Sequence, residues 1–295
     1  MTNQAAIVPR TSAFTREEVA RLIAYKQAVR AGLFQPVLQQ DQPASDCVGR
    51  RRQDTCGYLQ VETKIPMISV VIPVYNEAAL LGGCLEAIER AARDYRLEAE
   101  PVEVAVVLDA CTDRSAAVAV HHRAQIVSLD AHCVGAARAL GASFAIDSGA
   151  RWIAFTDADT IVPGDWLSAQ MAAAADAVCG AVWIADWSGH PSGVRERFLL
   201  QYGALDGRHV HGANLGLSVA AYRMSGGFRP LPQGEDAALV SSLIERGVEV
   251  AWNASPRVTT SARWESAVEG GLASVLRDLR ETCLAEAGAA APLAA

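Results

Sequence analysis

The sequence predicts an α/β protein in which a mostly parallel, doubly wound sheet is flanked by helices. From residue 65 onward, short apolar runs alternate with longer segments of helical periodicity. The first four runs consist almost entirely of Val, Ile, Leu and similar residues, as expected of parallel strands that are buried on both faces. With 295 residues, 51% of them hydrophobic, the chain can form a substantial core.

The individual elements follow from the same pattern. We expect strands over residues 67–74, 102–108, 125–129, 152–156 and 178–185. Between them we expect helices over residues 78–93, 114–122, 134–148 and 163–175. Sheets of this kind bind their ligands beyond the carboxyl ends of the strands, which makes the residues at those ends the first candidates for a site.

The two ends of the chain depart from this alternation. Thr15 and Glu18 form a capping-box pattern that opens a helix extending to Gly32, and a polar linker follows. We therefore divide the chain into an N-terminal helix and linker extension (1–64), an α/β domain (65–262) and a helical C-terminal tail (263–295).

Composition narrows the possible functions. A formal net charge of -7 argues against sequence-independent nucleic-acid binding, which requires clustered Lys and Arg. No stretch reaches the roughly 20 apolar residues that span a bilayer, and residues 1–10 do not resemble a secretory signal. The seven cysteines are scattered without a CxxC pair, as is typical of reduced thiols. We expect a cytoplasmic protein without a transmembrane segment.

Polar residues follow three of the predicted strands. Asn76 and Glu77 follow the first strand, Asp109 follows the second, and Asp157 and Asp159 follow the fourth. Taken singly, Asn76 or Asp109 would more often be a helix N-cap than a ligand. Three such strand ends in one sheet nevertheless indicate a polar site at this edge.

The pair Asp157 and Asp159 favours a cation site. Alternate residues at a strand end project to one side, about 6 to 7 Å apart. Two carboxylates at that distance repel by on the order of 3 kcal/mol at an effective dielectric constant of about 20. A divalent cation that prefers oxygen ligands, Mg²⁺ or Mn²⁺, reverses this repulsion.

A second acidic pair, Glu235 and Asp236, opens another predicted helix. Acidic residues at a helix N-terminus are also favourable through the helix dipole alone. A second pair in the same chain suggests a division of labour, in which one pair holds a metal and the other accepts a proton.

Six segments in this order resemble the motifs of family 2 glycosyltransferases. They are residues 68–77 (ISVVIPVYNE), 107–115 (VLDACTDRS), 155–159 (FTDAD), 212–214 (GAN), 226–228 (GGF) and 235–236 (ED). The resemblance covers roughly residues 67–252. It implies the GT-A type fold and an inverting enzyme that uses a nucleotide-diphosphate sugar as donor.

The resemblance also implies a role for each matching residue. The residues implied to line the pocket for the donor's base and ribose are Pro73, Tyr75, Glu77 and Asp109. Asp157 and Asp159 would bind the divalent cation and the donor's ribose and diphosphate. Asp236 would be the general base, supported by Glu235, and Asn214 would border the acceptor site.

Two departures from the family pattern bear on specificity. Leu108-Asp109 stands where two aspartates are frequent, and Ala110-Cys111 stands in place of Gly-Ser, so the donor nucleotide remains open among UDP, GDP and dTDP. The QxxRW motif of processive members is absent, and residues 260–264 read TSARW instead. We therefore expect non-processive transfer of one sugar to an acceptor hydroxyl on a saccharide, a lipid-linked compound or a small molecule.

Two alternatives remain open. Residues 157–160 (DADT) resemble the start of an aspartate-nucleophile phosphatase or phosphotransferase, although no lysine follows to stabilise a phosphoryl group. A catalytically inactive module that binds sugar nucleotides is the other alternative, and the presence of both carboxylate pairs argues against it.

Four basic or titratable side chains complete the candidates. Arg138 is as consistent with a surface ion pair as with a contact to the donor, and Arg263 reaches a phosphate only if the C-terminal segment folds over the site. His209 and His211 lie in an apolar stretch and are expected to pack rather than to catalyse. With few basic side chains expected near Asp159, the cation would supply the positive charge for the diphosphate.

Overall fold

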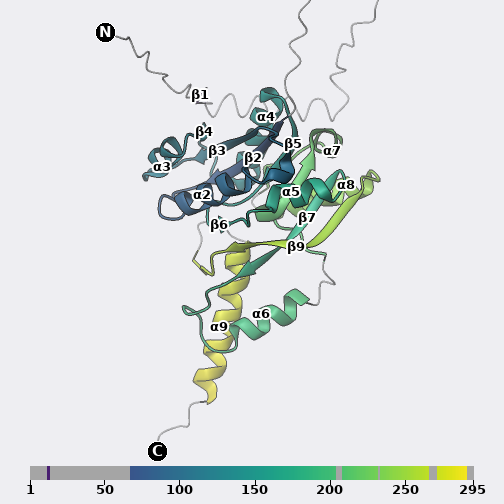
Figure 1. Cartoon of the computed structure of the whole chain (residues 1–295). Coiled ribbons are helices and arrows are strands. Elements are labelled where there is room, and N and C mark those ends of the chain that lie inside the picture. Colours follow the sequence, from purple (N-terminus) through teal and green to yellow (C-terminus); the bar gives the residue numbers. More distant parts are fainter. Residues whose placement is uncertain (1–11, 14–66, 204–207, 232, 266–270, 291–295) are drawn as a thin grey trace, which may run out of the picture. The chain divides into compact units, whose positions relative to one another are not determined.

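A nine-stranded sheet runs through the part of the chain that the computed structural model describes, residues 12–13, 67–203, 208–231, 233–265 and 271–290 (Figure 1). The strands are β1 (Ser12–Ala13), β2 (Met67–Val74), β3 (Val102–Asp109), β4 (Gln125–Leu129), β5 (Ala150–Phe155), β6 (Thr160–Ile161), β7 (Ala177–Ile184), β8 (Leu215–Ser218) and β9 (Val250–Thr260). The helix predicted near Thr15 lies outside the described residues.

Helices lie against this sheet and between its strands. They are α2 (Leu81–Ala91), α3 (Ser115–His121), α4 (Val134–Ser148), α5 (Trp166–Ala172), α6 (Val194–Gly203), α7 (Val219–Ser225), α8 (Glu235–Glu245) and α9 (Leu272–Ala290), with short 3-10 turns η1 (Tyr95–Leu97) and η2 (Gly212–Asn214). In the described part of the chain, no helix is both long and apolar enough to cross a bilayer.

The strand order is β1-β4-β3-β2-β5-β8-β7-β9-β6. Strands β1, β4, β3, β2 and β5 pair in parallel, whereas β8 is antiparallel to both β5 and β7. This arrangement confirms the predicted mostly parallel α/β sheet. Because β2, β3 and β5 run in the same direction, their carboxyl ends meet at one edge.

The predicted elements match the observed ones most closely where apolar runs are longest. Strands β2 and β4 and helix α4 have the predicted bounds. Helices α2 and α5 begin three residues later than expected, because residues 78–80 and 164–165 form turns. The short strand β8 was not among the predicted elements, because its sequence LGLS offers no extended apolar run.

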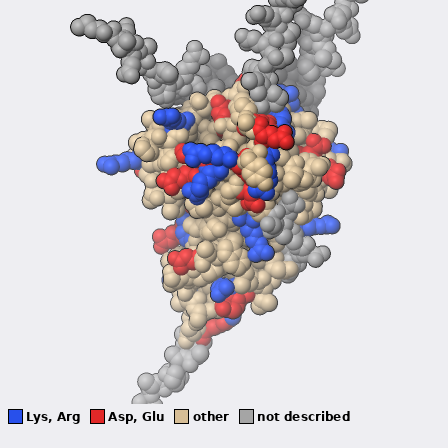
Figure 2. Space-filling model, in the orientation of Figure 1, with Lys and Arg blue, Asp and Glu red and all other residues tan. Residues whose placement is uncertain are grey.

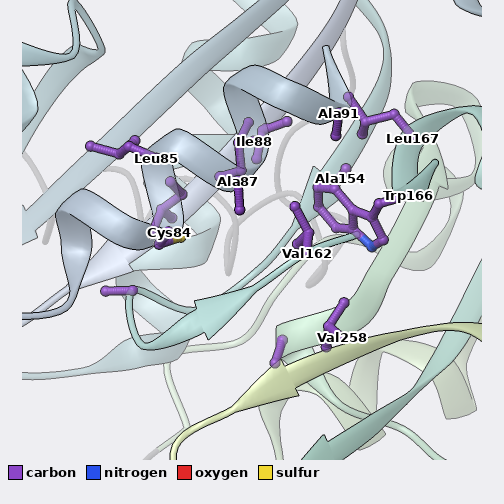
Figure 3. Packing of buried hydrophobic residues seen from close by; sticks show 14 of the residues in the cluster. Cys84, Leu85, Ala87, Ile88, Ala91, Ala154, Val162, Trp166, Leu167 and Val258 are labelled. Carbon is purple, nitrogen blue, oxygen red and sulfur yellow. The ribbon is translucent and has the colours of Figure 1, made fainter. Parts of the chain in front are cut away.

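One face of the sheet packs against α2. Leu81, Cys84, Leu85 and Ile88 recur at helical spacing on α2 and are buried. They join a cluster that includes Trp166 and strand residues from β2, β3 and β5. Figure 3 shows α2 facing Trp166 and Leu167 across this cluster.

A second apolar cluster joins α6 and α9. Val194 and Phe198 from α6 meet Leu276 and Leu279 from α9, and Ile184 at the end of β7 contributes to the same cluster. Trp187 is partly buried against it. Within the tail that the sequence predicts to be helical, residues 272–290 thus form a helix with a buried face.

The opposite face of the parallel strands packs closely against α4. A Cβ atom added at Gly141, in the middle of α4, would lie 2.3 Å from Val71 Cγ1 and 2.9 Å from Val107 Cγ2. Glycine is unfavourable inside helices by roughly 1 kcal/mol relative to alanine, so its presence here reflects this close approach of helix and sheet.

We predict that Gly141→Ala lowers the free energy of unfolding by about 1–3 kcal/mol, because overpacking forces Val71 or Val107 to move. Gly164→Ala serves as the control, since a Cβ atom there meets nothing within 4 Å. Urea unfolding followed by circular dichroism measures both variants. A Gly141→Ala protein as stable as the Gly164→Ala protein would show that α4 does not pack in this way.

Candidate active site

A cavity of about 720 Å³ opens at the edge where β2, β3 and β5 end. Eight of the nine predicted site residues line it: Pro73, Tyr75, Glu77, Asp109, Asp157, Asp159, Glu235 and Asp236. Strand ends supply the first six, and the N-terminus of α8 supplies Glu235 and Asp236. The structure therefore brings together carboxylates that are up to 159 positions apart, from Glu77 to Asp236.

Asn214 is the predicted site residue that does not line the cavity. Its side chain is buried, where its Oδ1 accepts a hydrogen bond from Trp166 Nε1 at 2.9 Å. Its Nδ2 donates to the carbonyl oxygens of Ala181 and Pro256 at 2.9 and 3.3 Å. These bonds turn its amide into the protein interior, and its predicted place beside the acceptor site stays a prediction.

Arg138 links the two acidic pairs. It lies on α4 and is only 4% exposed. Its Nη2 donates to Asp157 Oδ1 at 2.6 Å, and its Nη1 donates to Glu235 Oε1. Burial alone would lower the pKa of Arg138, but the two carboxylates outweigh it and hold that pKa above its usual value. Arg138 is therefore a buried, paired cation and not a surface ion pair.

Burial raises the pKa of both carboxyl groups that Arg138 contacts. For Asp157, desolvation outweighs the opposing effect of Arg138, and the charges of Asp159 and Asp236 raise its pKa further. For Glu235, desolvation likewise outweighs Arg138. These shifts arise first from desolvation, and the repulsion among the neighbouring carboxylates adds to it.

Arg263 pairs with the carboxylates on the other side of the cavity. Its Nη1 lies 2.5 Å from Glu77 Oε1, and its Nη2 lies 3.1 Å from Asp159 Oδ2. Ser261 Oγ donates to the same Asp159 oxygen at 2.6 Å. Arg138 and Arg263 thus both lie beside the DxD segment, residues 157–159. The expectation of few basic side chains near Asp159 is therefore wrong.

Asp236 is held by backbone donors instead of a cation. Its Oδ2 accepts a hydrogen bond from the Gly212 N–H at 2.8 Å, and its Oδ1 accepts one from the Ala237 N–H at 2.7 Å. Gly234, which precedes the pair, has a φ of +70°, a backbone conformation that favours glycine. This turn starts α8 so that Glu235 points to Arg138 while Asp236 stays partly accessible in the cavity.

Asp109 and Asn76 fix the loops that form the other wall. The Asp109 carboxylate accepts hydrogen bonds from the N–H groups of residues 131–133 at 2.7–2.9 Å. Asn76, with a φ of +56°, accepts from the N–H groups of Thr112 and Asp113 at 2.8 and 3.2 Å. Both side chains therefore hold loops in place, and Asp109 does so while lining the cavity.

The rings of Tyr75 and His132 also line the cavity on this wall. Their centroids are 5.5 Å apart, and their planes are tilted by 58°. Tyr75 is 37% exposed, so a flat ligand can reach its ring. This end of the cavity contains the residues expected to receive a nucleoside.

Tyr202 lines another part of the cavity and belongs to a stack of aromatic rings. His209 stacks on Tyr202 with ring centroids 3.7 Å apart, and Phe198 lies on α6 next to Tyr202 with a centroid distance of 5.3 Å. The Tyr202 hydroxyl lies 3.1 Å from His211 Nε2. Burial lowers the pKa of His211 to about 4, so its ring is neutral near pH 7. Both histidines are packed, as their apolar surroundings in the sequence predict.

The residues that sequence reasoning missed come mainly from α6, α9 and the segment after β9. The additional lining residues include Phe198, Tyr202, Ser261, Leu272 and Val275. Two glycines in the sequence mark positions where another group approaches the backbone closely. A Cβ atom at Gly212 would lie 2.2 Å from Arg138 Cζ, and one at Gly135 would lie 3.1 Å from Glu235 Cβ. Glycine at 212 lets the buried arginine approach the backbone, and glycine at 135 is required mainly by the Arg229 carbonyl oxygen, which a Cβ atom there would meet at 2.2 Å.

The carboxylates fit a cation only in combination with a ligand. In the described ranges, no three or more His, Cys, Asp and Glu side chains are grouped as a ready metal site. Mg²⁺ and Mn²⁺ are commonly held by one or two carboxylates together with substrate phosphates. Asp157 and Asp159 meet this requirement, since they share one wall of the cavity and repel each other.

Among the described lining residues, carboxylates outnumber guanidinium groups by six to two. On the face seen in Figure 2, side chains of both signs lie beside one another. Inside the cavity, by contrast, the balance is acidic, so a diphosphate would need additional positive charge to bind there.

Several solved structures share this fold. TarS of S. aureus, residues 1–349 in complex with UDP-GlcNAc, is 14% identical with a TM-score of 0.52, and the match covers 72% of this chain and 65% of that chain. A second TarS structure is 14% identical with a TM-score of 0.51, covering 66% of this chain and 36% of that chain. The chain thus spans less than two thirds of the length of either structure. This likeness confirms the GT-A type fold.

A search of curated proteins finds no match to the sequence. The model of the family described as "Glycosyl transferase family 2" matches residues 69–229, more than half of the chain. The matched region contains the ends of β2, β3 and β5 and the Gly212 segment that contacts Asp236. The chain belongs to glycosyl transferase family 2.

Proposed function

We propose that this protein transfers one sugar from a nucleotide-diphosphate sugar to an acceptor hydroxyl, non-processively and with inversion, assisted by a divalent cation. The observation that carries the proposal is that the pairs Asp157–Asp159 and Glu235–Asp236 share one cavity and are joined by Arg138. One pair can hold the leaving diphosphate through a cation while the other faces the acceptor.

The donor would lie along the wall made by the strand ends. Its nucleoside would occupy the end with Tyr75 and His132, which places the diphosphate near Asp157 and Asp159. A bound Mn²⁺ or Mg²⁺ supplies positive charge to the diphosphate oxygens as negative charge develops on them. Arg263 adds a second positive group beside Asp159. In support, the similar TarS structure holds UDP-GlcNAc.

Asp236 is better suited than Glu235 to be the general base. Glu235 is buried and its carboxylate is engaged by Arg138, so a proton would have to displace a salt bridge. Asp236 is more accessible, and each of its oxygens accepts one backbone N–H and keeps another lone pair for an acceptor hydroxyl. Glu235 then acts as a positioning residue through Arg138.

The placement of the two pairs supports the inversion that we propose. Asp157 and Asp159 follow β5, Asp236 opens α8, and the Arg138 guanidinium lies between Asp157 and Glu235. A sugar held between them has its leaving group on one side and the base on the other, which is the geometry of a single displacement. The acceptor oxygen forms the new bond to the anomeric carbon, the bond to the diphosphate breaks, and Asp236 takes the proton.

The two rival functions differ from this proposal in measurable ways. Family membership and the pairing of Asp157 with Arg138 both argue against a phosphatase that uses Asp157 as nucleophile. An inactive binding module would bind nucleotide sugars without turnover. Incubation with UDP-, GDP- and dTDP-sugars and Mn²⁺ distinguishes these cases by release of the nucleoside diphosphate.

We predict that Asp236→Asn lowers turnover by at least about 100-fold while leaving the donor Kd within about twofold, since a general base contributes to the rate and not to donor binding. Nucleoside-diphosphate release and calorimetric titration with the same donor measure the two quantities. Asp278→Asn, at an exposed position on α9, is the matched control. Near-full turnover by Asp236→Asn would refute the assignment of the base.

Asp159→Ala is predicted to weaken nucleotide binding and to remove its dependence on the metal. With Mn²⁺ present, the Kd for whichever of UDP, GDP and dTDP binds the wild type should rise at least about tenfold, because one cation ligand is lost. Chelation of the metal should weaken binding to the wild type by a similar factor. A wild-type Kd that is the same with Mn²⁺ and with EDTA would contradict metal assistance.

A further inference from the structure

One region of the cavity lining, formed by α6, α9 and the carboxyl end of β7, is apolar. Phe198 and Tyr202 from α6, Leu272 and Val275 from α9 and Val182 from β7 line this region. Phe198 also belongs to the cluster that packs α6 against α9, which makes this wall a continuation of a rigid core. We call this region the α6–α9 end. None of its five residues carries a charged side chain.

The backbone of His211 and Gly212 connects the α6–α9 end to Asp236 through two hydrogen bonds. The Gly212 N–H donates to Asp236 Oδ2 at 2.8 Å, and the preceding residue, His211, lies 3.1 Å from the Tyr202 hydroxyl through its Nε2. The Tyr202 oxygen in turn accepts a hydrogen bond from the Val182 N–H at 3.0 Å. Asp236 and the α6–α9 end therefore line one cavity and are linked through the His211–Gly212 backbone, so a compound whose hydroxyl reaches Asp236 can also contact this wall.

The arginine side chains that line the cavity are already paired with carboxylates. In the described part of its lining, both guanidinium groups, Arg138 and Arg263, are paired with carboxylates. His211 faces the charge of Asp236 and the ring of His209, and burial keeps it neutral near pH 7 with a pKa of about 4. An anionic acceptor would thus meet the Asp236 carboxylate and find no cation to compensate it.

We propose that the acceptor is an uncharged hydroxyl compound with an apolar group, an aromatic ring or a hydrocarbon chain, that lies at the α6–α9 end. This inference rests on the proposed function and specifies its substrate class. Apolar lining on α6 and α9 recovers free energy by removing such a group from water, whereas a phosphorylated or carboxylated acceptor loses hydration without gaining a partner.

The test compares glycosides that share one sugar and differ in one group. Methyl, phenyl and octyl β-glycosides of glucose, galactose and mannose, together with the three hexose 6-phosphates, are titrated calorimetrically into the full chain with Mn²⁺ and a bound nucleoside diphosphate. We expect the phenyl or octyl glycoside of at least one sugar to bind at least tenfold more tightly than its methyl glycoside and its 6-phosphate. A stronger phenyl series indicates an aromatic acceptor, and a stronger octyl series indicates a hydrocarbon chain.

Three outcomes would overturn the inference: a 6-phosphate that binds as tightly as the apolar glycosides, apolar glycosides no tighter than methyl glycosides, or no glycoside binding at all. Failure of the proposed function is a separate result, because none of UDP, GDP and dTDP would then bind in the first step of the titration. Binding of a nucleotide without the preference for apolar glycosides rejects only the acceptor class.

A charged substitution at the α6–α9 end tests whether the apolar group of the glycoside binds there. Val275 is 41% exposed and lines the cavity, so Val275→Lys adds a cation there without opening the core. We expect this variant to bind the preferred apolar glycoside at least fivefold more weakly than the wild type. Leu284→Lys, on the same helix at 48% exposure and outside the cavity lining, should bind it as the wild type does. Equal effects of the two variants would contradict the location.

Discussion

The arrangement of the site depends on one buried guanidinium. Arg138 joins Asp157 at the end of β5 to Glu235 at the start of α8, two segments that no strand pairing connects. Burial of a cation is costly unless the cation is paired, so the ion pairs of the Arg138 Nη atoms require α4, β5 and α8 to keep their relative positions. The Nε of Arg138 is buried without a hydrogen-bond partner among the described residues. Gly212 allows this approach, because a Cβ atom there would lie 2.2 Å from Arg138 Cζ.

The carboxylates that line the cavity have different roles, which depend on the groups that each one contacts. Asp109 is surrounded by three backbone N–H groups and shapes a loop, whereas Glu235 is neutralised by Arg138. Asp236 has backbone partners and remains accessible, and Asp157 and Asp159 face each other's charge beside two arginines. A cation that binds Asp159 shares that carboxylate with Arg263. These differences in environment separate proton transfer from diphosphate binding in the function we propose.

The sequence predicted the parallel half of the sheet because strands such as β2 and helices such as α4 are defined by local apolar patterns. It also located the acidic residues, because parallel strand ends meet at one edge. The clamp by Arg138 and the contribution of Tyr202 depend on tertiary contacts that no local pattern encodes. Asn214 shows the reverse case, since a motif residue is occupied by bonds inside the protein. The sequence therefore located the carboxylates that line the cavity better than the residues that hold them in place.

A double-mutant cycle on Arg138 and Glu235 tests most directly whether the buried guanidinium holds the site together. The free energies of unfolding in urea are measured for Arg138→Met, Glu235→Gln and the double variant. Arg138→Met alone should cost about 3–5 kcal/mol, because it leaves buried carboxylates unpaired, and the double variant should be less destabilised than the sum of the single variants. Additive effects, or an Arg138→Met protein as stable as the wild type, would show that this ion pair does not support the fold of the site.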